Sequence, residues 1–323
     1  MLTRRHTLRL ALLSTALAVV GGPVFAATPT SLNIFVPAAP GGGWDQTARS
    51  IEAAMRKDNI ISSFRVEHRP GAGGAVGLPV FVSSKKGQGD TIMIGGLVMV
   101  GSLVANNSPV GLNQVVPLAR LTGEAEVIVV PAESPFKTIK DLIEAMKKDV
   151  GKVSFAGGSA GGTDHILAGM IAKSLGLDPR KVAYVAYSGG GPAQAALLGN
   201  QVSAGISGVG EFAEQIKAGK LRALAVSSPN RVSDVDAPTL KESGVNVELS
   251  NWRGVFGAPG ISDEQRKDLI ALIEKMAAGS GWKYELENKG WDGILLTGDA
   301  FKKYVDEEVI RITAILTDLG LKK

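Results

Sequence analysis

The sequence predicts an α/β protein whose parallel-rich sheets carry helices on both faces and are divided between two lobes. Short β-branched runs alternate with helical patterns along most of the chain, which is typical of repeated βα units. Four glycine-rich turns each stand between a strand-like run and a helix-like run, two in the first third of the chain and two in the middle. The length of 323 residues exceeds the roughly 100–200 residues of a usual single core, which favours two lobes.

In the first third of the chain, strands and helices alternate around the first two glycine turns. A strand is predicted at residues 32–36 and a helix from about Asp45, whose carboxylate suits an N-cap. A second strand at residues 64–67 is followed by a helical stretch at residues 75–83. The apolar stretch 92–105 is interrupted by glycines and is too short to cross a bilayer, so we interpret it as a buried strand that runs into the start of a helix.

The middle of the chain continues this alternation. A strand at residues 127–130 precedes a helix at residues 139–148, which Thr138 begins. A strand at residues 153–156 leads into the third glycine turn and a helix that ends near Gly176. A strand is predicted at residues 182–187, before the fourth glycine turn, and another at residues 221–226, at the end of this region.

Two segments are candidate connections between the lobes. Residues 227–238, rich in proline, serine, asparagine and aspartate, are the clearer candidate, and residues 121–126 are the second. A strand and two amphipathic helices are predicted to complete lobe 1, at residues 255–258, 263–277 and 298–319. The predicted division is residues 1–26 as a signal peptide, 27–123 plus 228–323 as lobe 1, and 124–227 as lobe 2.

Residues 1–26 have the pattern of an export signal. Arg4, Arg5 and Arg9 make a basic start, residues 10–20 are apolar, and Val24-Phe25-Ala26 is a small-x-small cleavage site. We expect cleavage after Ala26 and a mature protein in the periplasm. The arginine pair leaves two export routes open, the general secretory route and the twin-arginine route.

Charge and cysteine content exclude several classes of protein. Three of the 35 basic residues lie in the export signal, which has no acid, so 32 basic residues face 31 acidic ones in the rest of the chain. This balance, without a dense basic stripe, lacks the electrostatic footprint of a nucleic-acid-binding protein. The chain has no cysteine, so we expect no disulfide framework even in an oxidising compartment.

The glycine-rich turns are the candidate binding elements. They occupy residues 40–45, 71–74, 157–164 and 188–192. Glycine lets backbone N–H groups approach a ligand closely, and a helix N-terminus offers unpaired N–H donors with a partial positive charge. A carboxylate, phosphate or sulfate is the natural guest at such a turn. The pattern therefore predicts a small anion held between the two lobes.

One of these turns also matches an enzyme motif. Residues 157–161 fit the nucleophile elbow G-x-S-x-G, with Ser159 between a strand and a helix. That fold needs a histidine well after the serine, but His6 and His68 precede Ser159 and His165 follows it too closely. A serine hydrolase is therefore the alternative hypothesis, and Ser159 is interpreted as a ligand hydrogen-bonder or a helix cap.

Other motifs do not require a cofactor or a metal. Residues 208–213 match the dinucleotide fingerprint G-x-G-x-x-A, but they lie in the middle of the chain and are interpreted as a turn with local packing. Asp164 and His165 have no further histidine or cysteine to build a coordination sphere, so no metal site is expected. Trp44 either packs against a ligand or covers its own loop, and both roles stay open.

Taken in order, several segments resemble the substrate-binding receptors of tripartite tricarboxylate transporters, often called Bug-type receptors. Each segment alone is weak evidence, but the ordered set is specific and covers essentially the whole mature chain. The segments are 36–45 (VPAAPGGGWD), 69–74 (RPGAGG), 158–165 (GSAGGTDH), 187–191 (YSGGG), 221–226 (LRALAV) and 252–254 (WRG).

The resemblance implies a type II periplasmic binding protein fold, with two α/β lobes joined by two crossover segments and a ligand in the cleft. It implies no enzymatic activity and no cofactor. It also implies that backbone amides and hydroxyls hold a carboxylate. The positions that match the family's binding turns are Gly42, Gly43, Trp44, Asp45, Ser159, Gly161, Thr163, Asp164, Gly189, Gly190 and Gly191.

The function implied by the resemblance is capture of a di- or tricarboxylate and its delivery to the membrane permease subunits of such a transporter. The alternative is a ligand sensor that docks on a membrane signalling protein. The sequence does not separate the two functions, because both use the state in which the lobes are closed around the ligand. We expect a monomer. Ser207-Gly208 stands where many relatives carry an acidic or amide residue, which leaves amine-bearing ligands less supported. The first turn, with three glycines and an aromatic residue, looks closer to the tricarboxylate-type receptors.

Overall fold

The computed structural model of the protein describes residues 30–233 and 235–322. The predicted export signal, residues 1–26, lies outside the described residues. Within the described ranges, no helix combines the length and the apolar character that crossing a membrane requires.

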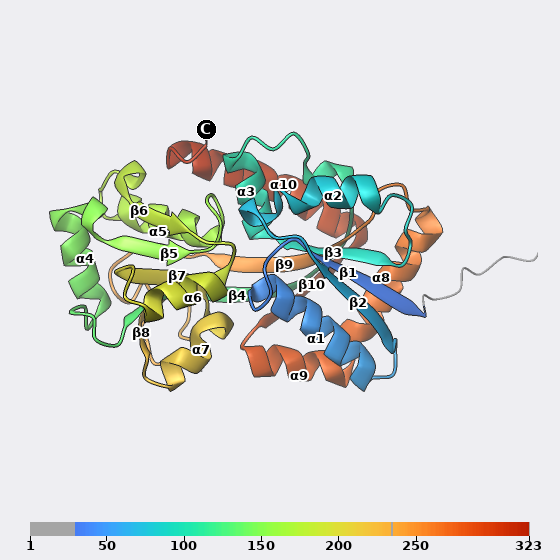
Figure 1. Ribbon diagram of the computed structural model, residues 1–323, viewed down its shortest axis with the longest axis horizontal. Coiled ribbons are helices and arrows are strands. Elements are labelled where there is room, and N and C mark those ends of the chain that lie inside the picture. Colours follow the sequence, from blue (N-terminus) through green and yellow to red (C-terminus); the bar gives the residue numbers. More distant parts are fainter. Residues whose placement is uncertain (1–29, 234, 323) are drawn as a thin grey trace, which may run out of the picture.

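Ten strands of the described ranges form the framework, in two groups that share one long strand (Figure 1). In the first group β1 pairs in parallel with β2 and β3, whereas β9 is antiparallel to β3 and β4, and β10 is antiparallel to β4. These strands are β1 (Ser31–Val36), β2 (Ser63–His68), β3 (Thr91–Gly96), β4 (Val116–Pro131), β9 (Ser250–Gly257) and β10 (Asp292–Thr297).

In the second group β5 pairs in parallel with β6 and β7, and the second half of β4 is antiparallel to β7 and β8. These strands are β5 (Ser154–Gly157), β6 (Ala183–Ala186), β7 (Ala204–Gly208) and β8 (Leu221–Val226). The α/β class is confirmed, but the sheet is mixed because β4 and β9 run against their neighbours.

The 16-residue strand β4 carries the chain from one group to the other. It pairs with β9 as far as Ala125 and with β7 from Glu126 onward. The chain returns through residues 227–249, where Ser227 N–H donates to Glu126 O and Leu249 N–H donates to Ser227 O. The predicted connection at residues 121–126 is therefore the interior of a strand, at the point where that strand changes partners.

Helices cover both faces of each group (Figure 1). In the first group α1 packs against α9 on one face, and α10 packs against α3 on the other. The helices of the first group are α1 (Gly43–Lys57), α2 (Gly77–Ser84), α3 (Leu97–Ala105), α8 (Asp263–Ala277), α9 (Ser280–Lys289) and α10 (Gly298–Asp318). The second group carries α4 (Ile139–Lys148), α5 (Thr163–Ser174), α6 (Gly190–Leu198) and α7 (Val209–Lys217).

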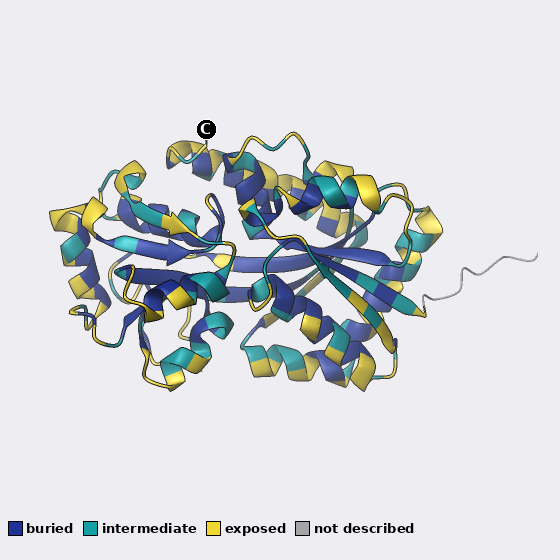
Figure 2. Ribbon diagram, viewed as in Figure 1, coloured by how far each residue is buried: buried dark blue, intermediate teal, exposed yellow. Residues whose placement is uncertain are grey.

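The hydrophobic core divides along the two faces of β4. Ile128 and Val130 join a large cluster that extends through both groups of strands, whereas Val127 and Val129 join a smaller cluster under α6 and α7. Successive side chains of a strand point to opposite faces, so a run of four aliphatic residues can serve both clusters. Figure 2 shows the resulting buried band along the strands.

Candidate functional site

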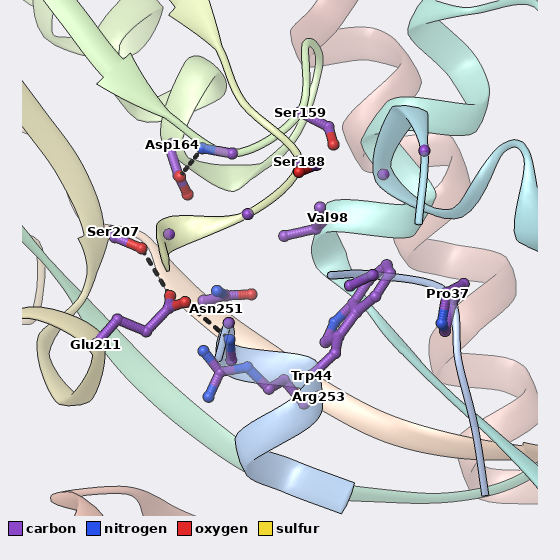
Figure 3. Close-up of a pocket in the computed structure, with 18 residues that line it drawn as sticks. Pro37, Trp44, Val98, Ser159, Asp164, Ser188, Ser207, Glu211, Asn251 and Arg253 are labelled. Carbon is purple, nitrogen blue, oxygen red and sulfur yellow. Dashed lines mark hydrogen bonds between the residues drawn. The ribbon is translucent and has the colours of Figure 1, made fainter. Parts of the chain in front are cut away.

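A cavity lies where the two groups of strands face each other (Figure 3). Its lining includes residues that directly follow the carboxyl ends of strands: Pro37 after β1, Gly158 after β5 and, at the end of β7, Ser207. In open α/β sheets, ligands bind outside the carboxyl ends of the strands. The predicted site residues that line it are Gly42, Gly43, Trp44, Ser159, Asp164, Gly189 and Gly190.

The other predicted site residues do not line the cavity but support residues beside it. Asp45 accepts a hydrogen bond from Gly41 N–H at 2.9 Å and contacts His68 Nε2 at 2.7 Å. Thr163 Oγ1 donates to Asn251 Oδ1 at 3.3 Å.

The last two of these residues are Gly161, which closely approaches another segment, and Gly191, which does not. Gly161 has φ +75°, and a Cβ there would overlap Ala105 and lie 3.0 Å from Gly101 O. At Gly191 a Cβ would lie 3.8 Å from Pro40 O.

Four helices begin beside the cavity. Helix α1 starts at Gly43, α5 at Thr163, α6 at Gly190 and α7 at Val209. The first N–H groups of a helix have no partner within the helix and carry a partial positive charge. At α1 and α7, N–H groups of the first turn already bond to Glu211 and Glu124. The start of α6, at Gly190 in the cavity lining, is therefore suited to an anionic group.

The lining of the cavity combines an apolar patch with polar groups. Pro37, Trp44 and Val98, from the first group of strands, give an apolar wall. The second group contributes hydroxyls from Ser159 and Ser188. Asn251 and Arg253, in β9 of the first group, also line the cavity, so a ligand would place hydrocarbon against the apolar patch and polar atoms elsewhere. Trp44 is both buried and part of this lining, so its side chain is positioned to touch a ligand.

Sequence reasoning missed Glu211, which bridges the two sides of the cavity. Its Oε1 accepts a hydrogen bond from Gly43 N–H at 2.8 Å, and its Oε2 accepts from Ser207 Oγ at 2.6 Å. The residue lies in the first turn of α7, within the segment 208–213 that we interpreted as a turn with local packing. The sequence did offer one signal for Glu211: it is an acidic residue shortly after a glycine turn, where the first turn of a helix begins.

Arg253 was also missed, although its segment contributed to the family resemblance. It is 1% exposed and forms an ion pair with Glu124, which is itself 1% exposed and accepts a hydrogen bond from Gly210 N–H at 2.7 Å. The guanidinium lies 5.2 Å from the centre of the Trp291 ring. Because the strand was predicted to begin only at residue 255, the sequence did not place Arg253 inside it.

Four carboxyl groups surround this one arginine. Glu124 and Glu126 come from β4, Asp164 from α5 and Glu211 from α7. Removal from solvent raises the pKa of Glu126 and of Glu211, and it raises the pKa of Asp164 to about 7 against the opposing hydrogen bond from Gly158 N–H. An excess of buried carboxyl groups over positive charge therefore favours proton uptake here.

We predict that the free protein loses stability as the pH rises from about 4 to about 7. The pKa of Asp164 increases from 3.8 to about 7 on folding, so the folded state holds a proton that the unfolded state releases in this range. The stabilising contribution is complete below pH 3.8 and is lost as the pH passes about 7. In thermal melts, Asp164→Asn should flatten this dependence, since asparagine can still accept the Gly158 N–H bond. An unchanged pH profile in Asp164→Asn would contradict the assignment.

The nucleophile-elbow motif lacks a base in the structure. His165 Nδ1 accepts a hydrogen bond from Gly161 N–H at 3.1 Å, and its ring stacks on Tyr184 at 4.2 Å. Desolvation lowers the pKa of His165 to about 4. His68 is hydrogen-bonded to Asp45 instead. Both histidines of the described ranges are thus engaged away from Ser159.

The glycines of the segment 208–213 serve packing. Gly208 is the N-cap of α7, and a Cβ there would overlap the Glu124 carboxylate. The fingerprint glycines therefore allow close approach to a protein side chain. Over residues 30–233 and 235–322, no group of three or more histidine, cysteine or acidic residues has the geometry to hold a metal ion.

The mixed α/β fold, the long shared strand and the cavity between two groups of strands define a ligand-binding protein of the periplasmic type. The chain belongs to the tripartite tricarboxylate transporter receptor family, because the model described as "Tripartite tricarboxylate transporter family receptor" matches residues 47–321. This is a family of binding proteins and not of enzymes.

Individual relatives agree with this assignment. The chain is 31% identical over 248 residues to a UPF0065 protein of Pseudomonas sp. strain P51. This alignment covers 75% of this chain and 72% of the relative. It is similar to the structure of the periplasmic binding protein BugD, with a TM-score of 0.80, 26% identity, and coverage of 91% of this chain and 98% of that one. The structure of MatC from Rhodopseudomonas palustris with bound malate gives a TM-score of 0.77 at 23% identity, covering 89% and 99%.

Proposed function

We propose that this protein is an exported receptor that captures a small organic acid in the cavity and delivers it to the membrane subunits of a tripartite transporter. The observation that carries the proposal is that the N-terminus of α6, at Gly190, and the hydroxyls of Ser159 and Ser188 line one cavity. The malate bound to MatC, a protein of the same fold, supports a carboxylate as the ligand. The sequence resemblance favours a di- or tricarboxylate.

The proposal includes the division of the chain. Residues 27–123 plus 228–323 form lobe 1, residues 124–227 form lobe 2, and cleavage after Ala26 releases a monomeric mature protein into the periplasm. The change of partners along β4 at Ala125–Glu126 supports the first boundary. Around the second boundary, Val235 and Ala237 still pack with the smaller core cluster, so the returning segment touches both lobes.

A thermal-shift screen against small organic acids tests the proposal. An acid at 100 times its Kd should stabilise the protein by about 2.7 kcal/mol, which is a readily measured rise in Tm. For the best acid, Ser159→Ala should weaken binding by about 0.5–1.5 kcal/mol in calorimetric titration, because one hydroxyl is lost. Ser84→Ala is the control, since that hydroxyl bonds only to Val80 O within α2. If no organic acid raises the Tm, the receptor proposal is wrong.

A further inference from the structure

We propose that the ligand presents a hydrogen-bond donor, an amine or a hydroxyl next to its carboxylate, to the side chain of Glu211. The cavity would then select small amino or hydroxy acids over acids that place a further carboxylate at this position. This inference rests on the proposed function, because it names the class of acid that the same cavity takes.

The first step is that Glu211 already occupies the anion site at the start of α1. Its Oε1 takes the Gly43 N–H bond, which a ligand carboxylate would otherwise receive. Its Oε2 takes the Ser207 hydroxyl proton. Both partners are donors, so the group presented here is an acceptor, and each carboxylate oxygen has a further lone pair for a donor of the ligand. Figure 3 shows the carboxylate between Ser207 and the loop that begins α1.

The second step concerns charge. Glu124, Glu126 and Asp164 lie close enough to Glu211 to interact with it electrostatically, and Arg253 is a positive charge that interacts with all four. Arg253 Nη1 and both carboxylate oxygens of Glu126 are buried without a hydrogen-bond partner within the described residues. A second ligand carboxylate beside Glu211 would add a like charge where solvent screens poorly. An ammonium group would reduce the excess negative charge, and a hydroxyl would leave it unchanged.

The third step places the ligand's own carboxylate. The hydroxyls of Ser159 and Ser188 line the cavity away from Arg253 (Figure 3), whereas Gly190, at the start of α6, lies beside the carboxylate of Glu211. The two hydroxyls offer neutral donors to one carboxylate. The hydrocarbon part then packs on Trp44 and the rest of the apolar wall. One carboxylate meets the two hydroxyls, and one adjacent donor meets Glu211.

Calorimetric titration with acids of matched carbon skeleton tests the inference near neutral pH. Butanoate, 2-hydroxybutanoate and 2-aminobutanoate differ only in the donor, whereas succinate, malate and aspartate add a second carboxylate. We expect the better of the two donor-bearing monocarboxylates to bind about tenfold or more tighter than butanoate and tighter than succinate. Comparing the amino acid with the hydroxy acid identifies the donor.

Glu211→Gln supplies the matched variant, because glutamine keeps the shape and one acceptor oxygen but removes the charge. It should weaken 2-aminobutanoate more than 2-hydroxybutanoate and should strengthen succinate several-fold. Glu214→Gln, at an exposed position of the same helix, should change none of these affinities.

Two results overturn the inference while the proposed function stands: succinate binding tighter than both donor-bearing monocarboxylates, and a ranking of acids that Glu211→Gln leaves unaltered. The first of these would mean that Glu211 holds a proton and donates it to a ligand carboxylate. If no acid in either set binds, and the wider screen also fails, the proposed function is overturned together with this inference.

Discussion

Arg253→Met is expected to lower the free energy of unfolding by about 3–5 kcal/mol, because it leaves the buried carboxylate of Glu124 without its cation. Glu126 and Glu211 also lose the positive charge that offsets their mutual repulsion. Urea denaturation followed by circular dichroism measures the change. The loss should be smaller at mildly acidic pH, where the carboxyl groups left behind can take up protons.

Two further variants separate a buried charge effect from loss of side-chain volume. Arg231→Met removes an ion pair with Glu242 in which both partners are exposed, and it should cost at most about 1 kcal/mol. Arg253→Met combined with Glu124→Gln should recover part of the stability, since no unpaired charge then remains at that position. If Arg253→Met lowers the free energy of unfolding no more than Arg231→Met does, the buried ion pair with Glu124 contributes no more to stability than an exposed one.

Elements with local signals were predictable from the sequence. The helix at residues 139–148 has the predicted bounds, and Thr138 forms a capping box with Asp141. The helix at residues 263–277 also has the predicted bounds, with a second capping box between Ser262 and Gln265. In both cases the amphipathic pattern and the cap lie within one short window, so no distant contact is needed to define them.

Elements defined by distant partners were not predictable in the same way. The strand predicted at residues 127–130 is the end of β4, which extends from Val116 because β9 and β10 pair along it. Helices α7 and α9 and strand β10 were missed. A strand such as β10, with mostly exposed or half-buried residues, lacks the alternating pattern that identifies strands.

The candidate site shows the same limit. Gly43 and Glu211 are 168 positions apart, yet their hydrogen bond closes one side of the cavity. The arginines nearest to the first two turns in sequence, Arg49 and Arg69, form ion pairs with Asp45 and Glu67 instead. The glycine pattern located the turns, but it could not distinguish a glycine that faces a ligand from one that admits a neighbouring side chain.

Gly43→Ala is the second substitution with a large expected effect. A Cβ at this position would overlap Arg253 Nη2 and lie 2.7 Å from its Cζ, so the buried guanidinium would have to move away from its ion pair with Glu124. Alanine normally favours a helix by about 1 kcal/mol over glycine, but overpacking costs about 1–3 kcal/mol and disturbing a buried ion pair adds to that. We expect a net loss of about 2 kcal/mol or more in urea denaturation.

Binding should fall as well, because displacing the start of α1 moves the Gly43 N–H group away from Glu211. For stability, Gly42→Ala is the matched control one residue earlier. Gly42 has φ −83°, and the nearest atom to its added Cβ would be Glu211 Oε1 at 3.5 Å, an ordinary contact. Gly42→Ala should lower the free energy of unfolding by less than about 1 kcal/mol, which is the size of a change in N-cap preference. Equal destabilisation by the two substitutions would show that general turn geometry, and not the close approach of Arg253, requires glycine at position 43.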